Sequence, residues 1–327
     1  MRILFCQLRN HGDIIRTFPS IEAIKINNPN YFIGYTCFEE MQETCSLCKS
    51  IDIIIPQPKF SPVTDTQGGT RILDCSIFYE TIEKVKKEKF DLYIDFHGVF
   101  QSAIFGMMCN IKHRLGRSKE TSKDGASLFY TDIYSIKEKN INRMFRHFDL
   151  CQKIFPNIKP IINNYAQNNN NIISIFPGSS KMGILKRLNI NKYLELANLL
   201  SKKSEVQFVL GKEDDDLIEV VKKSGFNFII TNYLEIILDK IINSKIVIGN
   251  DCAYTHLAIW KNIPTIMICG PTSEVINGVW KFGKGKTIKI ESDCICSDIW
   301  NNKCHNNHKC MENITIDYIL DSIEEFI

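Results

Sequence analysis

The sequence predicts an α/β fold with two domains, each built on a parallel sheet. Apolar strand-like runs alternate with helical patterns in both halves of the chain, and a polar segment separates the halves. This alternation is typical of strand–helix–strand units, in which neighbouring strands run parallel. The expected strands cover residues 2–8, 31–35, 51–55, 91–96, 172–176, 206–210, 246–248 and 264–269.

Helical patterns fill the intervals between these strands. They cover residues 13–27, 77–88, 99–109, 191–203 and 214–223, and a further helix opens after Asp251. Asparagines at 163–164 and 168–171 bracket a segment with no hydrophobic period, which is typical of a linker. We therefore expect an N-terminal domain at 1–162, a linker at 163–171, a C-terminal domain at 172–315 and a C-terminal helix at 316–327.

Bulk composition excludes several classes of protein. A chain of 327 residues is long enough for two α/β domains, and 44% hydrophobic with 24% charged residues is typical of a soluble globular protein. A net charge of +3 gives no case for nucleic-acid binding. No stretch approaches the roughly 20 apolar residues of a membrane span, and the N-terminus does not resemble a signal peptide. Although the chain has 13 cysteines, we expect a cytoplasmic protein without a disulfide framework.

The segment around Asp251 carries the most information about function. Gly249, Asn250 and Asp251 follow an apolar strand, and a helix begins directly after them. Ligands bind parallel sheets at this edge, and the N–H groups of a helix start suit a phosphate. His256, five residues further on, is either a ligand contact or a core histidine. An ordinary helix cap is the alternative for Asp251.

Two other loops follow strands in the same way. Gly12 permits a tight turn after the first strand, and Asp13 then places a carboxylate at the sheet edge, unless it only caps the helix. The loop at 177–180 has spare backbone N–H groups, and Lys186 adds a compact positive charge, so together they suit an anion. Lys181 is a second candidate for the lysine that binds the anion. The alternative to an anion site is a solvent-exposed basic loop without a ligand.

The motifs of this chain, and the order in which they occur, resemble those of a known family. Gly249-Asn250-Asp251, His256-Leu257-Ala258 and the run from Pro264 to Thr272 are similar to the donor-site signature of the ADP-heptose heptosyltransferases, glycosyltransferase family 9. A strand ending near His97 and a basic turn at Arg114-Leu115-Gly116 extend the likeness. The resemblance implies a GT-B fold, with two Rossmann-like domains facing across a cleft. It also implies that the first half binds the acceptor and the second half the nucleotide sugar.

The resemblance implies a role for each candidate residue. Asp13 corresponds to the general base that deprotonates the acceptor hydroxyl. Lys186 corresponds to the lysine that neutralises the leaving diphosphate. The implied donor-binding residues are Lys186, Ser179, Ser180, Glu213, Asp251, Cys252, Ala253 and His256, and the implied acceptor-binding residues are His97, Arg114 and Arg117. Asp214 and Asp215 compete with Glu213 for the nucleoside.

Four cysteines near the C-terminus suggest a metal site. Cys294, Cys296, Cys304 and Cys310 lie within 17 residues, in a loop at 294–310 rich in polar residues. Four thiolates at short range suit tetrahedral zinc or iron. Such loops occur in some members of the family that this chain resembles, including the autotransporter heptosyltransferases. Unmetallated surface thiols are the alternative, and any metal here is expected to be structural.

The sequence therefore predicts an inverting glycosyltransferase that moves heptose from ADP-heptose to a lipopolysaccharide inner-core sugar and needs no cofactor for chemistry. Three alternatives stay open. The cysteine group favours a protein Ser/Thr acceptor, and Cys252 and Ala253, which depart from the family pattern, leave room for another nucleotide sugar. The departures of several motifs from the family pattern leave room for a non-catalytic nucleotide-sugar-binding protein. We expect a glycan or protein acceptor and peripheral contact with the inner membrane. The oligomeric state is not predicted.

Overall fold

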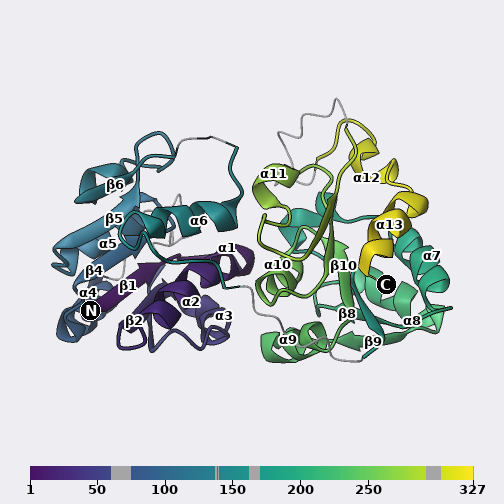
Figure 1. The fold of residues 1–327 in the computed structure, drawn as a ribbon, viewed down its shortest axis with the longest axis horizontal. Helices are drawn as coiled ribbons and strands as arrows, with labels where there is room; N and C mark the ends of the chain where they lie inside the picture. Colours follow the sequence, from purple (N-terminus) through teal and green to yellow (C-terminus); the bar gives the residue numbers. More distant parts are fainter. Residues whose placement is uncertain (60–74, 137, 139, 162–169, 292–302, 327) are drawn as a thin grey trace, which may run out of the picture. The chain divides into compact units, whose positions relative to one another are not determined.

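The computed structural model describes residues 1–59, 75–136, 138, 140–161, 170–291 and 303–326, which form two compact units (Figure 1). Unit 1 comprises residues 1–139 and 144–161, and unit 2 comprises residues 140–143 and 162–327. Most of the expected linker at 163–171 lies outside the described residues. Within the described residues, none of the helices is long and apolar enough to cross a membrane.

The described part of unit 1 contains a six-stranded parallel sheet. Its strands are β1 (Arg2–Cys6), β2 (Phe32–Phe38), β3 (Ile53–Gln57), β4 (Leu92–Asp95), β5 (His113–Arg117) and β6 (Asp132–Tyr134), in the order β3-β2-β1-β4-β5-β6. The central strand β1 is buried from Ile3 to Cys6, which explains its continuous apolar run.

Short helical elements connect these strands. They are α1 (His11–Ile15), α2 (Phe18–Asn27), η1 (Glu39–Met41), α3 (Gln42–Ser46), α4 (Cys75–Glu88), α5 (Phe100–Met108), η2 (Ala126–Phe129) and α6 (Arg143–Gln152). The single helix expected at 13–27 is divided in two. Pro19 lies in the first turn of α2, where its missing N–H favours a helix start over a continuation.

Strand β5 was expected as a turn, and that expectation was wrong. Leu115, Gly116 and Arg117 are buried, and β5 pairs with both β4 and β6. The backbone of Gly116 packs closely on the ring of Tyr130. A Cβ at this position would lie 2.3 Å from that ring, so a larger residue would clash with it. The polar residues His113, Arg114 and Arg117 interrupt the apolar pattern by which a buried strand is recognised in a sequence.

The described part of unit 2 contains a second six-stranded parallel sheet. Its strands are β7 (Ile172–Phe176), β8 (Glu205–Leu210), β9 (Asn227–Ile230), β10 (Ile246–Asn250), β11 (Thr265–Ile268) and β12 (Gly285–Ile288), in the order β12-β11-β10-β7-β8-β9. Strands β9 and β12 at the two ends were not expected from the sequence.

The helical elements of unit 2 pack on this sheet. They are η3 (Lys181–Lys186), α7 (Ile190–Leu200), α8 (Asp215–Ser224), α9 (Leu234–Ile242), α10 (Ala253–Trp260), α11 (Glu274–Asn277), α12 (Lys309–Glu312), α13 (Ile316–Ile323) and η5 (Glu324–Phe326). The C-terminal helix expected at 316–327 is α13 with η5. Ile319 and Ile323 bury α13 in the core of unit 2, where it packs on α7, β11 and β12.

Both sheets have a point where the strand order reverses. In unit 1 the chain builds outward from β1 to β2 and β3 on one side, and from β4 to β6 on the other. In unit 2 the same reversal lies between β7 and β10. Loops that leave the carboxyl ends of the two strands at such a point diverge, and the crevice between them is where open α/β sheets bind ligands. Each unit therefore presents one candidate edge.

Candidate active site

In unit 1, Asp13 lies in the first turn of α1, beside the carboxyl end of β1. Its Oδ1 accepts a hydrogen bond from Arg16 Nη1 at 2.8 Å, and its Oδ2 accepts one from Asn10 Nδ2 at 3.0 Å. The helix cap is Asn10 rather than Asp13. The Asp13 side chain is 23% exposed, so solvent or a ligand reaches a carboxylate whose direction is fixed by two donors.

His97 follows β4 on the other side of the same strand reversal. Its Nδ1 lies 2.8 Å from Gln7 Nε2, and since an amide nitrogen only donates, Nδ1 accepts and the proton lies on Nε2. Burial, helped by the positive charge of Arg9 and opposed by Asp13, lowers the pKa of His97 to about 4. The ring is therefore neutral at pH 7, with an Nε2–H donor.

A buried carboxylate shapes the loop that carries His97. Asp95, at the end of β4, accepts hydrogen bonds from the backbone N–H groups of His97 at 2.8 Å and Gly98 at 3.0 Å. Its second oxygen accepts a hydrogen bond from the Tyr130 hydroxyl at 2.7 Å. Burial raises the pKa of Asp95. These contacts were not expected from the sequence, although Asp95 stands in the matched motif.

The two arginines expected to bind the acceptor are engaged with backbone carbonyls. Arg117 is buried and donates to the carbonyl of His97. Arg114 donates from Nε to the carbonyl of Phe129 at 2.7 Å and from Nη1 to that of Ile111 at 2.6 Å. Both side chains hold unit 1 together, and their contact with an acceptor stays a prediction.

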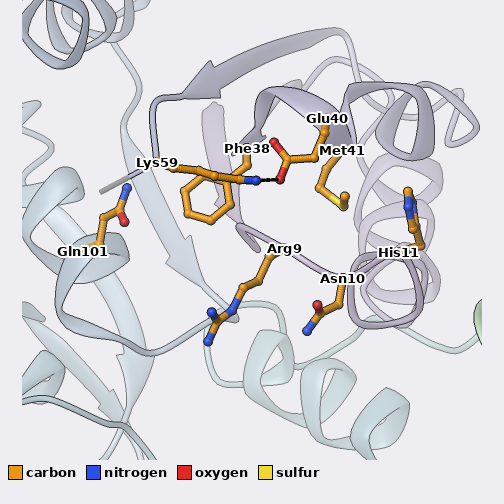
Figure 2. Close-up of a pocket in the computed structure, with 8 residues that line it drawn as sticks. All are labelled: Arg9, Asn10, His11, Phe38, Glu40, Met41, Lys59 and Gln101. Atoms are coloured by element: carbon orange, nitrogen blue, oxygen red, sulfur yellow. Dashed lines mark ion pairs between the residues drawn. The ribbon is translucent and has the colours of Figure 1, made fainter. Parts of the chain in front are cut away.

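A pocket of about 470 Å³ lies at the carboxyl ends of β1, β2 and β3 (Figure 2). Its lining residues are Arg9, Asn10, His11, Phe38, Glu40, Met41, Lys59 and Gln101. Lys59 pairs with Glu40, and Figure 2 shows Arg9 and Asn10 across the pocket from this pair. Arg9, the side-chain amides of Asn10 and Gln101, the Phe38 ring and the Lys59–Glu40 ion pair form a polar lining with one further positive charge, which suits an anionic sugar. The sequence did not single out Arg9 and Lys59 as contacts, since isolated basic residues are common on surfaces.

In unit 2, the side chain of Asn250 connects three segments at the strand reversal. Its Oδ1 accepts hydrogen bonds from the Leu188 backbone N–H at 2.9 Å and the Tyr193 hydroxyl at 2.8 Å. Its Nδ2 donates to the carbonyl of Pro177 at 2.8 Å. Asn250 is fully buried, so the loop after β7, the segment after η3 and α7 all take their positions from β10.

Asp251 brings together two of the expected donor residues. The carboxylate is 3% exposed. Its Oδ2 lies 3.2 Å from Lys186 Nζ, and its Oδ1 lies 3.1 Å from His256 Nε2. Opposite charge from Lys186 offsets part of the cost of burying the carboxylate. His256 is itself buried and orients Asp251, which fits both of its sequence interpretations.

The remaining donor candidates surround this pair. The Ser179 hydroxyl donates to the carbonyl of Gly183 at 2.8 Å and accepts from Arg187 Nε at 3.0 Å, whereas Ser180 is exposed. Cys252 and Ala253 begin α10 and are half-buried. Glu213 is exposed beyond the end of β8.

Asp214, the competitor of Glu213, is buried and has a structural role. It accepts hydrogen bonds from Arg187 Nη2 and from the Gly211 backbone N–H, both at 2.8 Å. A Cβ on Gly178 would meet its carboxylate at 2.2 Å, so this position admits only glycine. Contact between Glu213 and the nucleoside therefore stays a prediction. Arg187 stabilises the loop through its hydrogen bond with Asp214.

Comparisons with known proteins identify the family and the fold. The sequence matches the family model for glycosyltransferase family 9 (heptosyltransferase) over residues 78–315. The chain belongs to glycosyltransferase family 9. It is thus a glycosyltransferase of the heptosyltransferase family. No curated protein sequence matches this family 9 chain.

Solved structures show the same fold at low sequence identity. Heptosyltransferase WaaC from E. coli, with ADP-2-deoxy-2-fluoro heptose, has a TM-score of 0.74 and 18% identity, with 99% of each chain covered. The E. coli ADP-heptose lipopolysaccharide heptosyltransferase II has a TM-score of 0.73 and 15% identity, covering 100% of this chain and 98% of that one. These likenesses show that the family 9 chain has the GT-B fold.

A third structure is relevant to the cysteine group. The iron-containing dodecameric glycosyltransferase TibC from enterotoxigenic E. coli has a TM-score of 0.54 and 12% identity, covering 99% of this chain and 75% of that one. In the family 9 chain, Cys294 and Cys296 lie outside the described residues. Among the residues that are described, no group of three ligands gathers. Cys310 is buried, and Cys304 Sγ accepts a hydrogen bond from the His308 N–H at 3.2 Å.

The lowered pKa of His97 predicts a specific pH dependence of stability. Between its usual 6.5 and about 4, the unfolded chain binds a proton at this ring and the folded chain does not. The free energy of unfolding therefore falls as pH drops through this range, by up to about 3 kcal/mol from His97 alone. His97→Asn, which keeps an acceptor for Gln7, should flatten this fall. Urea unfolding of both proteins at pH 7 and pH 4.5 measures it, and identical pH dependence would contradict the assignment.

Proposed function

We propose that this enzyme transfers heptose from ADP-heptose to a sugar of the lipopolysaccharide inner core, with inversion at the anomeric carbon. The observation that carries the proposal is the Lys186–Asp251–His256 cluster at the strand reversal of unit 2. It presents one fixed ammonium group at the edge where a nucleotide diphosphate binds an open α/β sheet. Family membership and the likeness to a structure holding an ADP-heptose analogue support this donor.

In the proposed reaction, the acceptor hydroxyl attacks the anomeric carbon and its proton passes to the carboxylate of Asp13. The bond from that carbon to the diphosphate oxygen breaks, and ADP leaves with the bonding electrons. Lys186 stabilises the negative charge that develops on the departing diphosphate. Lys186 is 15% exposed, so a bound diphosphate meets a cation that is already largely desolvated and oriented by Asp251. Glu213 and Ser180, both exposed, are proposed to contact the nucleoside and the phosphates.

The acceptor is proposed to bind unit 1 in the pocket between Arg9 and Lys59. A concave site of about 470 Å³, in which Lys59 neutralises Glu40 and Arg9 supplies positive charge, suits an anionic sugar better than an extended peptide, which would follow a long groove. The likeness to TibC and the cysteine group keep a protein Ser/Thr acceptor as the second candidate. A lipid-linked acceptor also brings the enzyme, which we place in the cytoplasm, into peripheral contact with the inner membrane.

The function is tested directly with purified protein. A panel of nucleotide sugars is screened by thermal shift, and release of ADP from ADP-heptose is measured with a heptose-free inner-core acceptor and with a Ser/Thr-rich peptide. We expect ADP-heptose to raise the melting temperature most, since a ligand that binds the folded state stabilises it. Faster turnover with the peptide would show that the acceptor is a protein and not an inner-core sugar. A larger stabilisation by another nucleotide sugar would identify that sugar as the donor. Binding without transfer to either acceptor would show that the protein is a non-catalytic nucleotide-sugar-binding protein.

Asp13→Asn should lower turnover by about 10²-fold or more while donor binding and fold are kept, because a general base is lost. Initial rates at saturating ADP-heptose measure the effect. Asp124→Asn is the matched control, as this carboxylate is exposed in unit 1 and its left-handed backbone accommodates asparagine. Near-normal turnover of Asp13→Asn would show that Asp13 serves only the local structure of α1.

Lys186→Ala should weaken ADP binding and slow transfer, because it removes the cation at Asp251. Lys181→Ala, at the exposed start of the same η3 element, should do less. Calorimetric titration with ADP compares the two variants, and their melting temperatures are measured alongside. If Lys181→Ala has the larger effect on binding, the lysine that serves the diphosphate has been assigned to the wrong position.

We also propose that the four cysteines hold one structural zinc or iron per chain, since four soft ligands exclude magnesium and calcium as natural occupants. The N–H donor to Cys304 is a contact that would stabilise a thiolate. Changing Cys304 and Cys310 to Ser should abolish bound metal in elemental analysis and lower the melting temperature. Purified wild-type protein without metal and with four titratable thiols at these positions would refute the site.

A further inference from the structure

His308 contacts the donor loop at the residue that precedes Lys186. Its Nε2 lies 2.6 Å from the carbonyl oxygen of Leu185, across 123 residues of sequence. A carbonyl oxygen only accepts, so Nε2 carries the proton and donates it. This hydrogen bond joins the segment after the cysteine loop to η3, and both partners belong to unit 2.

The segment that carries His308 is anchored independently of η3. Its backbone has φ 57° as the cap of α12, and its N–H donates to Cys304 Sγ at 3.2 Å. Directly after it, Cys310 and Met311 are buried in the core of unit 2. Lys192 Nζ from α7 donates to the carbonyls of Glu312 and of Ile314, the latter at 3.0 Å.

By contrast, η3 packs weakly on its own. Met182 is 60% exposed and Ile184 is 45% exposed, and Gly183 breaks the helical geometry in the middle of the element. The position of η3 therefore depends on its buried Gly183 and on the contacts at its ends, which include those of Arg187 with Ser179, Asp214 and Asp216. The carbonyl of Leu185 is one such contact, one residue from the lysine whose ammonium lies 3.2 Å from Asp251.

We propose that His308 is a positioning residue for Lys186. Through the carbonyl of Leu185 it holds the C-terminal end of η3 at the donor edge, and Cys304 fixes the backbone from which His308 reaches that carbonyl. The conformation of the segment from Cys304 to His308 is thereby coupled to the affinity for a nucleoside diphosphate. This inference rests on the proposed role of Lys186 at the diphosphate, and it concerns nucleotide binding whatever sugar the nucleotide carries.

The first experiment measures ADP binding by calorimetric titration. His308→Ala should weaken ADP binding about 5- to 10-fold, the usual effect of losing one hydrogen bond that orders a site. His308→Gln should stay within about twofold of the wild type, because its amide nitrogen can donate to the same carbonyl. Lys309→Ala, an exposed neighbour in the same segment, is the control and should not change binding. Equal losses in the Ala and Gln variants would overturn the proposal.

A double-mutant cycle then tests whether His308 acts through Lys186. If it does, adding His308→Ala to Lys186→Ala should change ADP binding by less than about twofold, because the group that His308 positions is already gone. A merely structural effect would add in full to that of Lys186→Ala, and full additivity would overturn the proposal.

Hydrogen exchange separates this inference from the proposed function. Backbone amides at 181–187 should exchange faster in His308→Ala than in wild type or Lys309→Ala, without any ligand present. Faster exchange in a protein that transfers no heptose would refute the function and support the role of His308. Unchanged exchange would refute the role of His308 even in a fully active enzyme.

Discussion

The hydrogen bonds of the Asn250 side chain are the constraint on which the donor edge depends. A fully buried amide that loses a partner carries a large desolvation cost, so its three partners from Pro177, Leu188 and Tyr193 are held at once. Asn250 is the last residue of β10, and Asp251 follows it directly. The position of the buried carboxylate, and with it that of Lys186, is therefore set by the strand and not by the loop alone.

Unit 1 uses the same device with a different side chain. Asp95 is the last residue of β4, which borders the strand reversal as β10 does in unit 2. It also accepts hydrogen bonds from the loop that follows and from a distant tyrosine. No repeat between the halves is visible in the sequence. The shared feature is physical: a polar side chain at a buried strand end fixes the loop that carries the functional group.

Much of the fold and part of the candidate site were predictable from the sequence. Strand-like runs placed the parallel sheets, and Asp13 and Asp251, which follow two of these runs, lie at the carboxyl ends of β1 and β10, the edge where open α/β sheets bind ligands. Strand β5 was missed because His113, Arg114 and Arg117 are residue types usually found on surfaces, although Leu115 and Gly116 between them are buried in the sheet. The contact between Lys186 and Asp251 joins residues 65 positions apart and was not predicted, because the resemblance implied only that each of them binds the donor.

The framework of hydrogen bonds was not predictable. Asn250, Arg187 and His308 lie in expected loops and Asp95 lies in an expected strand, and nothing in the sequence indicates which backbone groups or side chains they contact. Arg187 shows the difficulty most clearly. In the sequence it stands beside Lys186 as the second member of a basic pair, yet its guanidinium is bound by Asp214, Asp216 and Ser179.

The separation of the two frameworks has a consequence for how such enzymes diversify. The hydrogen bonds of Asp95 lie within unit 1 and those of Asn250 lie within unit 2, so each of these loops is ordered by contacts inside its own unit. Under the proposed division of roles, with the acceptor on unit 1 and the nucleotide sugar on unit 2, recombination that exchanges unit 1 for that of a family member would redirect the sugar to a new receiving molecule while the activated sugar stays the same.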